Sequence, residues 1–234
     1  MMYWANGFWL NVFMMSEAKY DPVKDFAPIT ITHNSRNVLL VTPALPVKTV
    51  QDLVKLAKSK PNELNIGRTA NPGGSNTLAA VLFAAVTGTQ FNEILYKSTN
   101  QIITDIAAGR IEVGFPGLAG AIPLMKTGKV RGLAITASER SALTPDLPTV
   151  TSIYKDYDAS SVQALFAPKA TPQPIVARLV DASNKAVSNP EIKEKLMALG
   201  LDPIGSTPQQ LTAFMVADMK NMGKVIKDRG FKAD

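Results

Sequence analysis

One polar, glycine-rich turn in this chain has the residue types needed to hold an anion. The stretch TANPGGSNTLAAVLF, residues 69–83, runs from a polar turn directly into an apolar helical pattern. Glycine allows close backbone approach and positive φ, and Ser75 and Asn76 are favourable N-caps. The first N–H groups of a helix lack internal partners and lie at its positive end. The turn predicts a site for a carboxylate or a small oxyanion, with a well-capped helix start as the alternative.

The same turn does not match the known nucleotide-binding patterns. No Lys-Ser or Lys-Thr pair follows Gly73 and Gly74, as a P-loop requires. The dinucleotide pattern G-x-G-x-x-G is also absent. A carboxylate therefore suits the turn better than a nucleotide.

Neighbouring loops strengthen the expectation of a binding site. Strand patterns at 91–96, 111–117 and 130–137 are each followed by a loop, and Ser98 and Thr99 open a second helix. Ligands of open α/β sheets bind beyond the carboxyl ends of the strands. Two helix starts rich in glycine or hydroxyl groups at one sheet edge predict a cleft there.

The elements that would position these residues alternate between strand and helix. Helical patterns with caps begin at Thr49, Asn189 and Thr207, and glycines follow others at Gly88 and Gly109. Pro123 is expected in the first turn of its helix or at a kink. Such alternation predicts an α/β fold with a mostly parallel sheet. Residues 41–155 contain enough strands for a domain, whereas the C-terminal helices need a partner sheet.

Composition excludes several classes of function. The 234 residues include no cysteine and one histidine, His33, which excludes thiol chemistry and a histidine-rich metal site. The net charge is +6, and the Lys and Arg residues are scattered along the chain and not interleaved with aromatic residues, so no nucleic-acid partner is expected. No apolar run approaches the ~20 residues that span a bilayer. Without a nucleophile–base pair, metal cluster or cofactor motif, the chain is not expected to be an enzyme.

Several motifs, in their order and spacing, resemble one family along the whole chain. They are YDPVKDFAPIT, the glycine turn with LAAVLF, YKS, AAGRIEVGF, KTGKVRGLAIT, ERSALTPDLPTV, LFAPKATP and GSTPQQLTAF. This pattern resembles the Bug/TctC family, the extracytoplasmic receptors of tripartite tricarboxylate transporters. The resemblance implies a type II periplasmic-binding-protein fold, in which two α/β domains close on a carboxylated ligand in the cleft between them.

The resemblance also implies the domains and the binding residues. Domain 1 would comprise residues 1–40 and 160–234, and domain 2 residues 41–159, with hinges near 36–42 and 159–164. The family's first strand and its Pro-Gly-Gly loop precede the segment that matches MMYWANGFWLN, so domain 1 is expected to be incomplete at its N-terminus. Phe8 and Phe115 would pack against the ligand or fill the core. The implied ligand-binding residues are Asn71, Gly73, Gly74, Ser75, Asn76, Thr77, Ser98, Thr99, Gly7, Phe8, Phe115, Pro116 and Ser161.

The expected function is capture of a small carboxylate for the membrane subunits of such a transporter. By resemblance the location is periplasmic, although the N-terminus lacks the pattern of a signal peptide. No cofactor or metal is implied. Two alternatives stay open: a ligand-sensing protein of the same fold, and a binding-impaired fragment that lacks half of the carboxylate clamp.

Overall fold

A computed structural model of the chain describes residues 1–71, 73–141 and 143–228. The chain divides into two compact units, which are considered separately. Unit 1 comprises Met1–Ser35 and Ser161–Asp234, and unit 2 comprises Arg36–Ser160. The sequence predicts the first boundary at 40/41, whereas this division lies at 35/36 and keeps β3 (Val38–Val41) with the strands of unit 2 that it pairs with.

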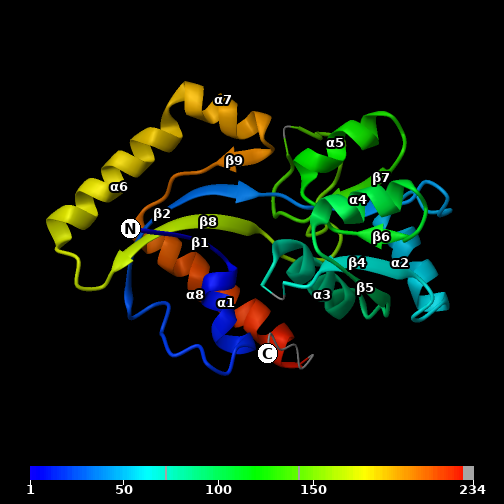
Figure 1. The fold of residues 1–234 in the computed structure, drawn as a ribbon, viewed down its shortest axis with the longest axis horizontal. Coiled ribbons are helices and arrows are strands. Elements are labelled where there is room, and N and C mark those ends of the chain that lie inside the picture. Colours follow the sequence, from blue (N-terminus) through cyan, green and yellow to red (C-terminus); the bar gives the residue numbers. More distant parts are fainter. Residues whose placement is uncertain (72, 142, 229–234) are drawn as a thin grey trace. The chain divides into compact units, whose positions relative to one another are not determined.

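Unit 1 is built on an antiparallel sheet. Its strand order is β1-β8-β2-β9, and every neighbouring pair is antiparallel. Figure 1 shows the long strands β2 and β8 side by side, with the short β1 and β9 outside them. The strand bounds are β1 Met2–Ala5, β2 Phe26–Ser35, β8 Ser161–Pro168 and β9 Leu201–Pro203.

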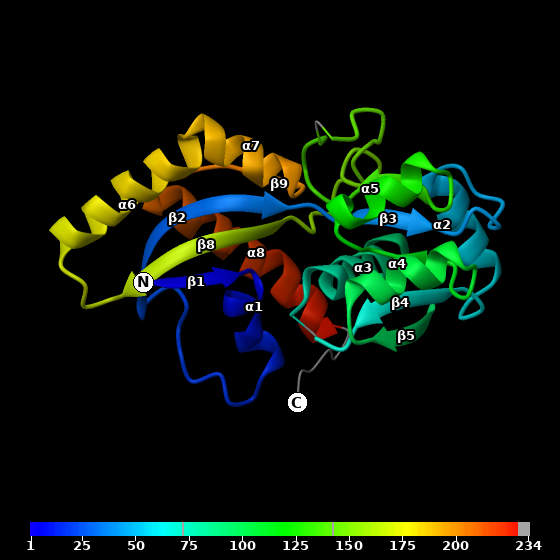
Figure 2. The same cartoon turned by 45° about the horizontal axis from the view of Figure 1, so that its top comes forward.

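Helices cover both faces of this sheet. Successive residues of a strand point to opposite sides, so each strand gives side chains to both layers of helices. Phe166 of β8 meets the ring of Trp9 in α1, whereas the next residue, Ala167, packs against Val176 of α6. In Figures 1 and 2, α6 and α7 lie on one side of the sheet and α1 and α8 on the other. The helix bounds are α1 Gly7–Met14, α6 Gln173–Ser188, α7 Pro190–Ala198 and α8 Pro208–Asp228.

Unit 2 contains a mixed sheet, which corrects the prediction of a mostly parallel one. Its strand order is β5-β4-β6-β3-β7. The strand β4 is parallel to β5 and β6, but β3 is antiparallel to both of its neighbours. Four strands thus share one direction, and β3 alone opposes them. The remaining bounds are β4 Asn65–Thr69, β5 Asn92–Tyr96, β6 Val113–Gly114 and β7 Arg131–Ile135.

The helices of unit 2 also lie on both faces of their sheet. Gly114 of β6 faces Ile102 of α4, and the next residue, Phe115, faces Phe83 of α3. The buried isoleucines of α4 join Val38 and Leu40 of β3 in one apolar core. The helix bounds are α2 Val50–Ser59, α3 Ser75–Thr87, α4 Thr99–Ala107 and α5 Leu118–Lys126.

Most predicted helix ends are confirmed. Thr49 and Asp52 form a capping box, Asn189 caps α7, and Gly88 ends α3 with a φ of 65°. Thr207 and Gln210 exchange the reciprocal bonds of a capping box at the start of α8.

One local prediction is wrong. The strand expected at 111–117 is confined to β6, because Phe115–Gly117 turn away towards α5. Pro123 lies inside α5 beyond its first turn, which leaves the kink as the expected alternative.

Candidate functional site

The strand directions in unit 2 gather its candidate residues at one edge of the sheet. Since β4, β5, β6 and β7 share a direction, their carboxyl ends meet at the same edge. The opposed strand β3 begins there, so Asn37 is added to this edge. A bridge between Asn37 and Gly117 and a hydrogen bond from Thr136 N–H to the Asn37 carbonyl join the loops.

The start of α3 leaves its backbone donors uncapped. The N-cap residue is Gly74, and no side chain of the described residues caps the backbone N–H groups of the first turn. The prediction that Ser75 or Asn76 is the cap is therefore wrong by one or two positions. The first backbone bond of α3 runs from Leu78 N–H to the Gly74 carbonyl, which leaves Ser75, Asn76 and Thr77 without intrahelical acceptors.

Asn76 adds a side-chain donor to these backbone groups. It is only 3% exposed, and its Oδ1 accepts a 2.9 Å hydrogen bond from Thr69 Oγ1. Its Nδ2 is buried and has no hydrogen-bond partner among the described residues. Leaving a buried amide unpaired costs about 1–3 kcal/mol, so an acceptor placed beside this Nδ2, from water or a ligand, would be stabilised.

Thr77 and Gly74 hold this turn against the end of β4. Thr77 is fully buried and donates from Oγ1 to the Thr69 carbonyl at 3.0 Å. A Cβ at position 74 would lie 3.1 Å from both the Asn71 carbonyl and Thr69 Oγ1. Gly74 has a φ of −67°, so glycine is needed here for close packing and not for a left-handed backbone.

Asn71 organises the loop that precedes α3. Its Oδ1 accepts from Gly73 N–H at 3.1 Å, and its carbonyl accepts from Gly74 N–H. Asn71 itself is exposed. The loop therefore uses its own polar groups internally and leaves the donors of the first helical turn open.

Asn37 is a candidate that sequence reasoning missed. It is 3% exposed, its N–H donates to Thr136 Oγ1, and its Nδ2 is buried with no partner among the described residues. The only sequence signal is an asparagine directly before the apolar run VLLV, which is equally typical of an ordinary loop.

The second helix start is a capped one. Ser98 is the N-cap of α4, and its Oγ accepts from Gln101 N–H at 3.5 Å. Thr99 is the first residue of α4 and is half-buried. The structure thus places Ser98 and Thr99 at the same sheet edge as Asn76, although the Ser98 hydroxyl already serves the helix.

The aromatic candidate of unit 2 is packed inside the protein. Phe115 is fully buried, with its ring 5.5 Å from that of Phe83. The Tyr157 ring packs on Phe83, and its O–H donates to the Ala79 carbonyl of α3 at 3.3 Å. Burial raises the pKa of Tyr157 well above its ordinary value. These contacts favour the core alternative for Phe115.

Pro116 is buried, and its carbonyl accepts from Val38 N–H.

The candidates of unit 1 lie on α1 and β8. Gly7 is the first residue of α1 and follows closely after the end of β1 at Ala5. The Phe8 ring stacks 5.2 Å from Tyr20 and meets Phe26 edge-on at 4.9 Å, which favours its core alternative. Ser161 is buried and begins β8, opposite Ser35 of β2.

The described part of the chain offers no group of three or more His, Cys, Asp or Glu side chains that could hold a metal ion. Among its helices, none is long and apolar enough to cross a membrane. The arrangement at the unit 2 edge is instead a set of neutral N–H donors, which suits a small anion.

Comparison with known proteins identifies the family. Residues 2–231 match the model of the tripartite tricarboxylate transporter family receptor, TctC. This chain belongs to the TctC family. Members of that family are solute-binding receptors and do not form an enzyme class.

Individual TctC relatives cover most of this chain. The UPF0065 protein in the TAR-I ttuE-ttuC' intergenic region of Agrobacterium vitis is 30% identical over 90% of this chain and 62% of its own length. Protein BugT of Bordetella pertussis is 27% identical over 94% of this chain and 67% of its own length. The chain thus spans about two thirds of the length of these curated relatives.

A solved structure shows the same fold. The R. palustris protein Rpa4515, solved with adipate, is 29% identical to this chain, with a TM-score of 0.80. The match covers 97% of this chain and 77% of Rpa4515. The α/β architecture is therefore that of the periplasmic binding proteins of the TctC family.

Proposed function

We propose that this chain captures a small carboxylate-bearing solute and that the start of α3 binds the carboxylate. The observation that carries the proposal is the buried Asn76 Nδ2, which no described residue pairs, beside three N–H groups of the first helical turn that no described side chain caps. A carboxylate oxygen would accept from these donors, and the helix dipole would favour its negative charge. The family supports a receptor role, and the relative Rpa4515 was solved with a dicarboxylate.

The proposal extends to location and partners. As a TctC-family receptor, the chain would work in the periplasm and deliver its ligand to the membrane subunits of a tripartite tricarboxylate-type transporter. The stretch Thr69–Phe83 contains no charged residue, so the donors that the start of α3 itself offers are N–H dipoles.

The first experiment is isothermal titration calorimetry of the full chain with mono-, di- and tricarboxylates and aromatic acids. We expect heat of binding for at least one member, and a thermal shift for the same compound. A ligand at 100 times its Kd should stabilise the protein by about 2.7 kcal/mol. If no acid in the panel gives heat or a thermal shift, the proposal for this chain is wrong.

The substitution Asn76→Asp separates binding from folding. The aspartate keeps the oxygen that accepts from Thr69 Oγ1 but replaces the Nδ2 donor with a negatively charged acceptor. A carboxylate in the first turn of α3 also interacts favourably with the helix dipole. Because position 76 is buried, the new charge also costs stability, so a melting curve checks that the variant is folded. We expect its affinity for the carboxylate to fall by about tenfold or more.

The matched control is Asn221→Asp. This exposed asparagine lies on α8 in unit 1, and its substitution makes the same change in charge. Affinity should stay within about twofold of the original protein. Equal affinity in Asn76→Asp and the original protein would show that the carboxylate binds elsewhere.

A further inference from the structure

The outer strand of the unit 2 sheet has a side that no strand covers. β5 pairs with β4 alone and ends the sheet order. Asn92 N–H donates to the Leu64 carbonyl, and the Tyr96 carbonyl accepts from Ala70 N–H, so both residues bond towards β4. Because the bonding side alternates along a strand, the backbone groups of Glu93 and Leu95 point away from the sheet. Among the described residues no strand lies on that side.

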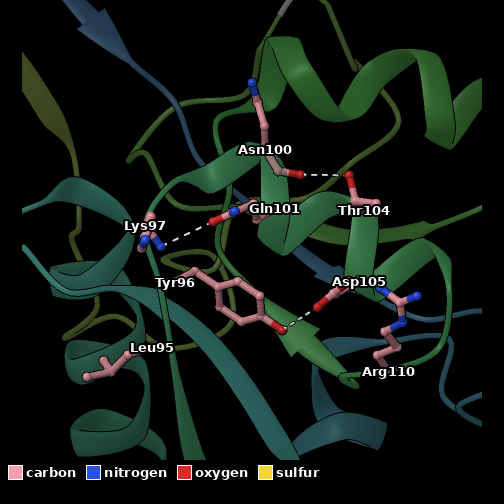
Figure 3. A pocket seen from close by; sticks show the side chains of 8 residues that line it. All are labelled: Leu95, Tyr96, Lys97, Asn100, Gln101, Thr104, Asp105 and Arg110. Carbon is pink, nitrogen blue, oxygen red and sulfur yellow. Dashed lines mark hydrogen bonds and ion pairs between the residues drawn. The ribbon is translucent and has the colours of Figure 1, made fainter.

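A groove of about 650 Å³ lies along this edge and the neighbouring helix α4. Figure 3 shows Tyr96 from β5 and a polar row of α4 side chains lining it, with Lys97 and Arg110 at separate places on the rim. Its lining residues are Leu95, Tyr96, Lys97, Asn100, Gln101, Thr104, Asp105 and Arg110.

The carboxylates near the groove are already paired. Asp105 accepts from Tyr96 O–H at 2.8 Å and from Arg110 at 2.9 Å. Glu93 is paired with Arg68 at 2.5 Å. The Lys97 side chain is exposed and its ammonium has no ion-pair partner among the described residues, while Arg110 uses only one nitrogen on Asp105. The charge left uncompensated in the groove is positive.

Leu95 makes this edge unusual for a sheet margin. Its exposed fraction is 58%, at the fourth of the five positions of β5. The other outward-bonding residue, Glu93, has its charge paired with Arg68. Edge strands normally carry charges or prolines that prevent pairing with another chain. An open edge with an exposed leucine and a paired glutamate, beside a basic groove, therefore has the features of a strand-addition site.

We infer that the groove between β5 and α4 docks an extended acidic segment of a partner protein, which adds to the sheet beside β5. Its backbone would pair with the outward N–H and C=O groups of Glu93 and Leu95, in the manner of β-augmentation. Its acidic side chains would meet Lys97 and Arg110, and an apolar side chain would cover Tyr96. A small free anion would leave the outward backbone groups unpaired, so a peptide fits the edge better.

The test uses the full chain and fluorescein-labelled peptides read by fluorescence polarisation. The probe is Thr-Val-Glu-Val-Asp, compared with Thr-Val-Lys-Val-Lys and with a version of the acidic peptide methylated on its backbone nitrogens. We expect the acidic probe to bind about tenfold or more tightly than either comparison peptide. Equal binding of the acidic and basic peptides, or no binding at millimolar concentration, would overturn the inference.

Two substitutions test whether the acidic peptide binds at the groove between β5 and α4. Leu95→Pro removes an N–H that the sheet does not use, and Lys97→Glu reverses the unpaired charge. Each should weaken the acidic probe about tenfold or more. Lys129→Glu changes the charge of another exposed lysine of unit 2 and should leave binding unchanged.

Circular dichroism and a melting curve establish that each variant is folded. Lys97 is exposed, so we expect Lys97→Glu to fold. This variant therefore tests the inference even if Leu95→Pro does not fold. Full binding by folded Lys97→Glu, or an equal loss in Lys129→Glu, would place the peptide elsewhere on the protein.

Discussion

The Asn76 side chain uses its Oδ1 acceptor within the fold, while no described residue uses its Nδ2 donor. Its Oδ1 joins the network with Thr69 that ties α3 to β4, and its Nδ2 is buried without a partner among the residues that the structure describes. The sequence predicted the anion site but named the wrong cap, because Gly74, Ser75 and Asn76 are all acceptable N-caps. With Gly74 as the cap, Asn76 falls in the first turn, where its side chain can turn back to the strand.

Asp105 offers a test of the polar contacts beside β5. The Tyr96 hydrogen bond is the largest cause that lowers the pKa of Asp105, followed by the bond from Arg110. In turn, burial and the Asp105 carboxylate raise the pKa of Tyr96 to about 12. We expect Tyr96→Phe to raise the pKa of Asp105 towards its ordinary value, measured by NMR titration of its carboxyl carbon.

The sign of the pH effect follows from the lowered pKa. Asp105 contributes stability above its ordinary pKa, and this contribution is lost as pH falls through the lowered folded value. Tyr96→Phe should therefore lose stability relative to the original protein near neutral pH, with a difference that shrinks in acid. Tyr154→Phe, a partly buried tyrosine of the same unit, is the control and should leave the Asp105 titration unchanged. If the pKa of Asp105 is the same in Tyr96→Phe as in the original protein, the hydrogen bond from Tyr96 does not lower it and the contact with Arg110 does.

At the level of elements, two paired glycines allow α4 to lie close to its sheet. Gly67 of β4 and Gly114 of β6 are partners in register. A Cβ at Gly67 would lie 2.7 Å from Ile111 Cδ1, and one at Gly114 would lie 2.7 Å from Ile102 Cγ2. The absent side chains make room for the isoleucines of α4 and its neighbouring loop, which form much of the unit 2 core.

We expect Gly114→Ala to destabilise unit 2 by about 1–3 kcal/mol, the usual cost of an overpacked core. Strand positions favour alanine over glycine by about 0.5–1 kcal/mol, so the clash at 2.7 Å should outweigh that gain. Urea unfolding measures the change in free energy. Gly117→Ala is the matched control, since a Cβ there meets nothing within 4 Å. Unchanged stability in Gly114→Ala would mean that α4 can shift without cost.

The helices of this chain were far easier to predict than its sheets. The period of apolar residues and the capping pairs at Thr49 and Thr207 mark helix positions locally. The direction of β3 depends on which strands lie beside it, and no local pattern encodes that choice. The brevity of β6 has the same origin, because its pairing ends where the chain turns towards α5.

At the level of the whole chain, each unit has its own sheet and apolar core. Residues 36–160 include all five strands of the unit 2 sheet and the cluster around Ile102, Val38 and Leu40. We expect this segment to fold when expressed alone, with a cooperative melting transition and dispersed NMR signals.

The shorter segment 42–160 is its control. It lacks β3, which lies between β6 and β7 and cannot be lost without splitting the sheet. This segment should give no cooperative transition. Cooperative unfolding of 42–160, or its absence in 36–160, would contradict the assignment of β3 to the core of unit 2.

The pairing of Ser35 with Ser161 has a consequence for synthesis on the ribosome. β2 is complete once residue 35 has emerged, but its partner β8 follows only after the whole of unit 2. At usual rates of translation this delay is on the order of ten seconds. During that time the ten residues of β2, which are mostly buried in the native protein, cannot pair with β8. Nascent chains of this protein should therefore depend on chaperones most strongly between the emergence of β2 and that of β8.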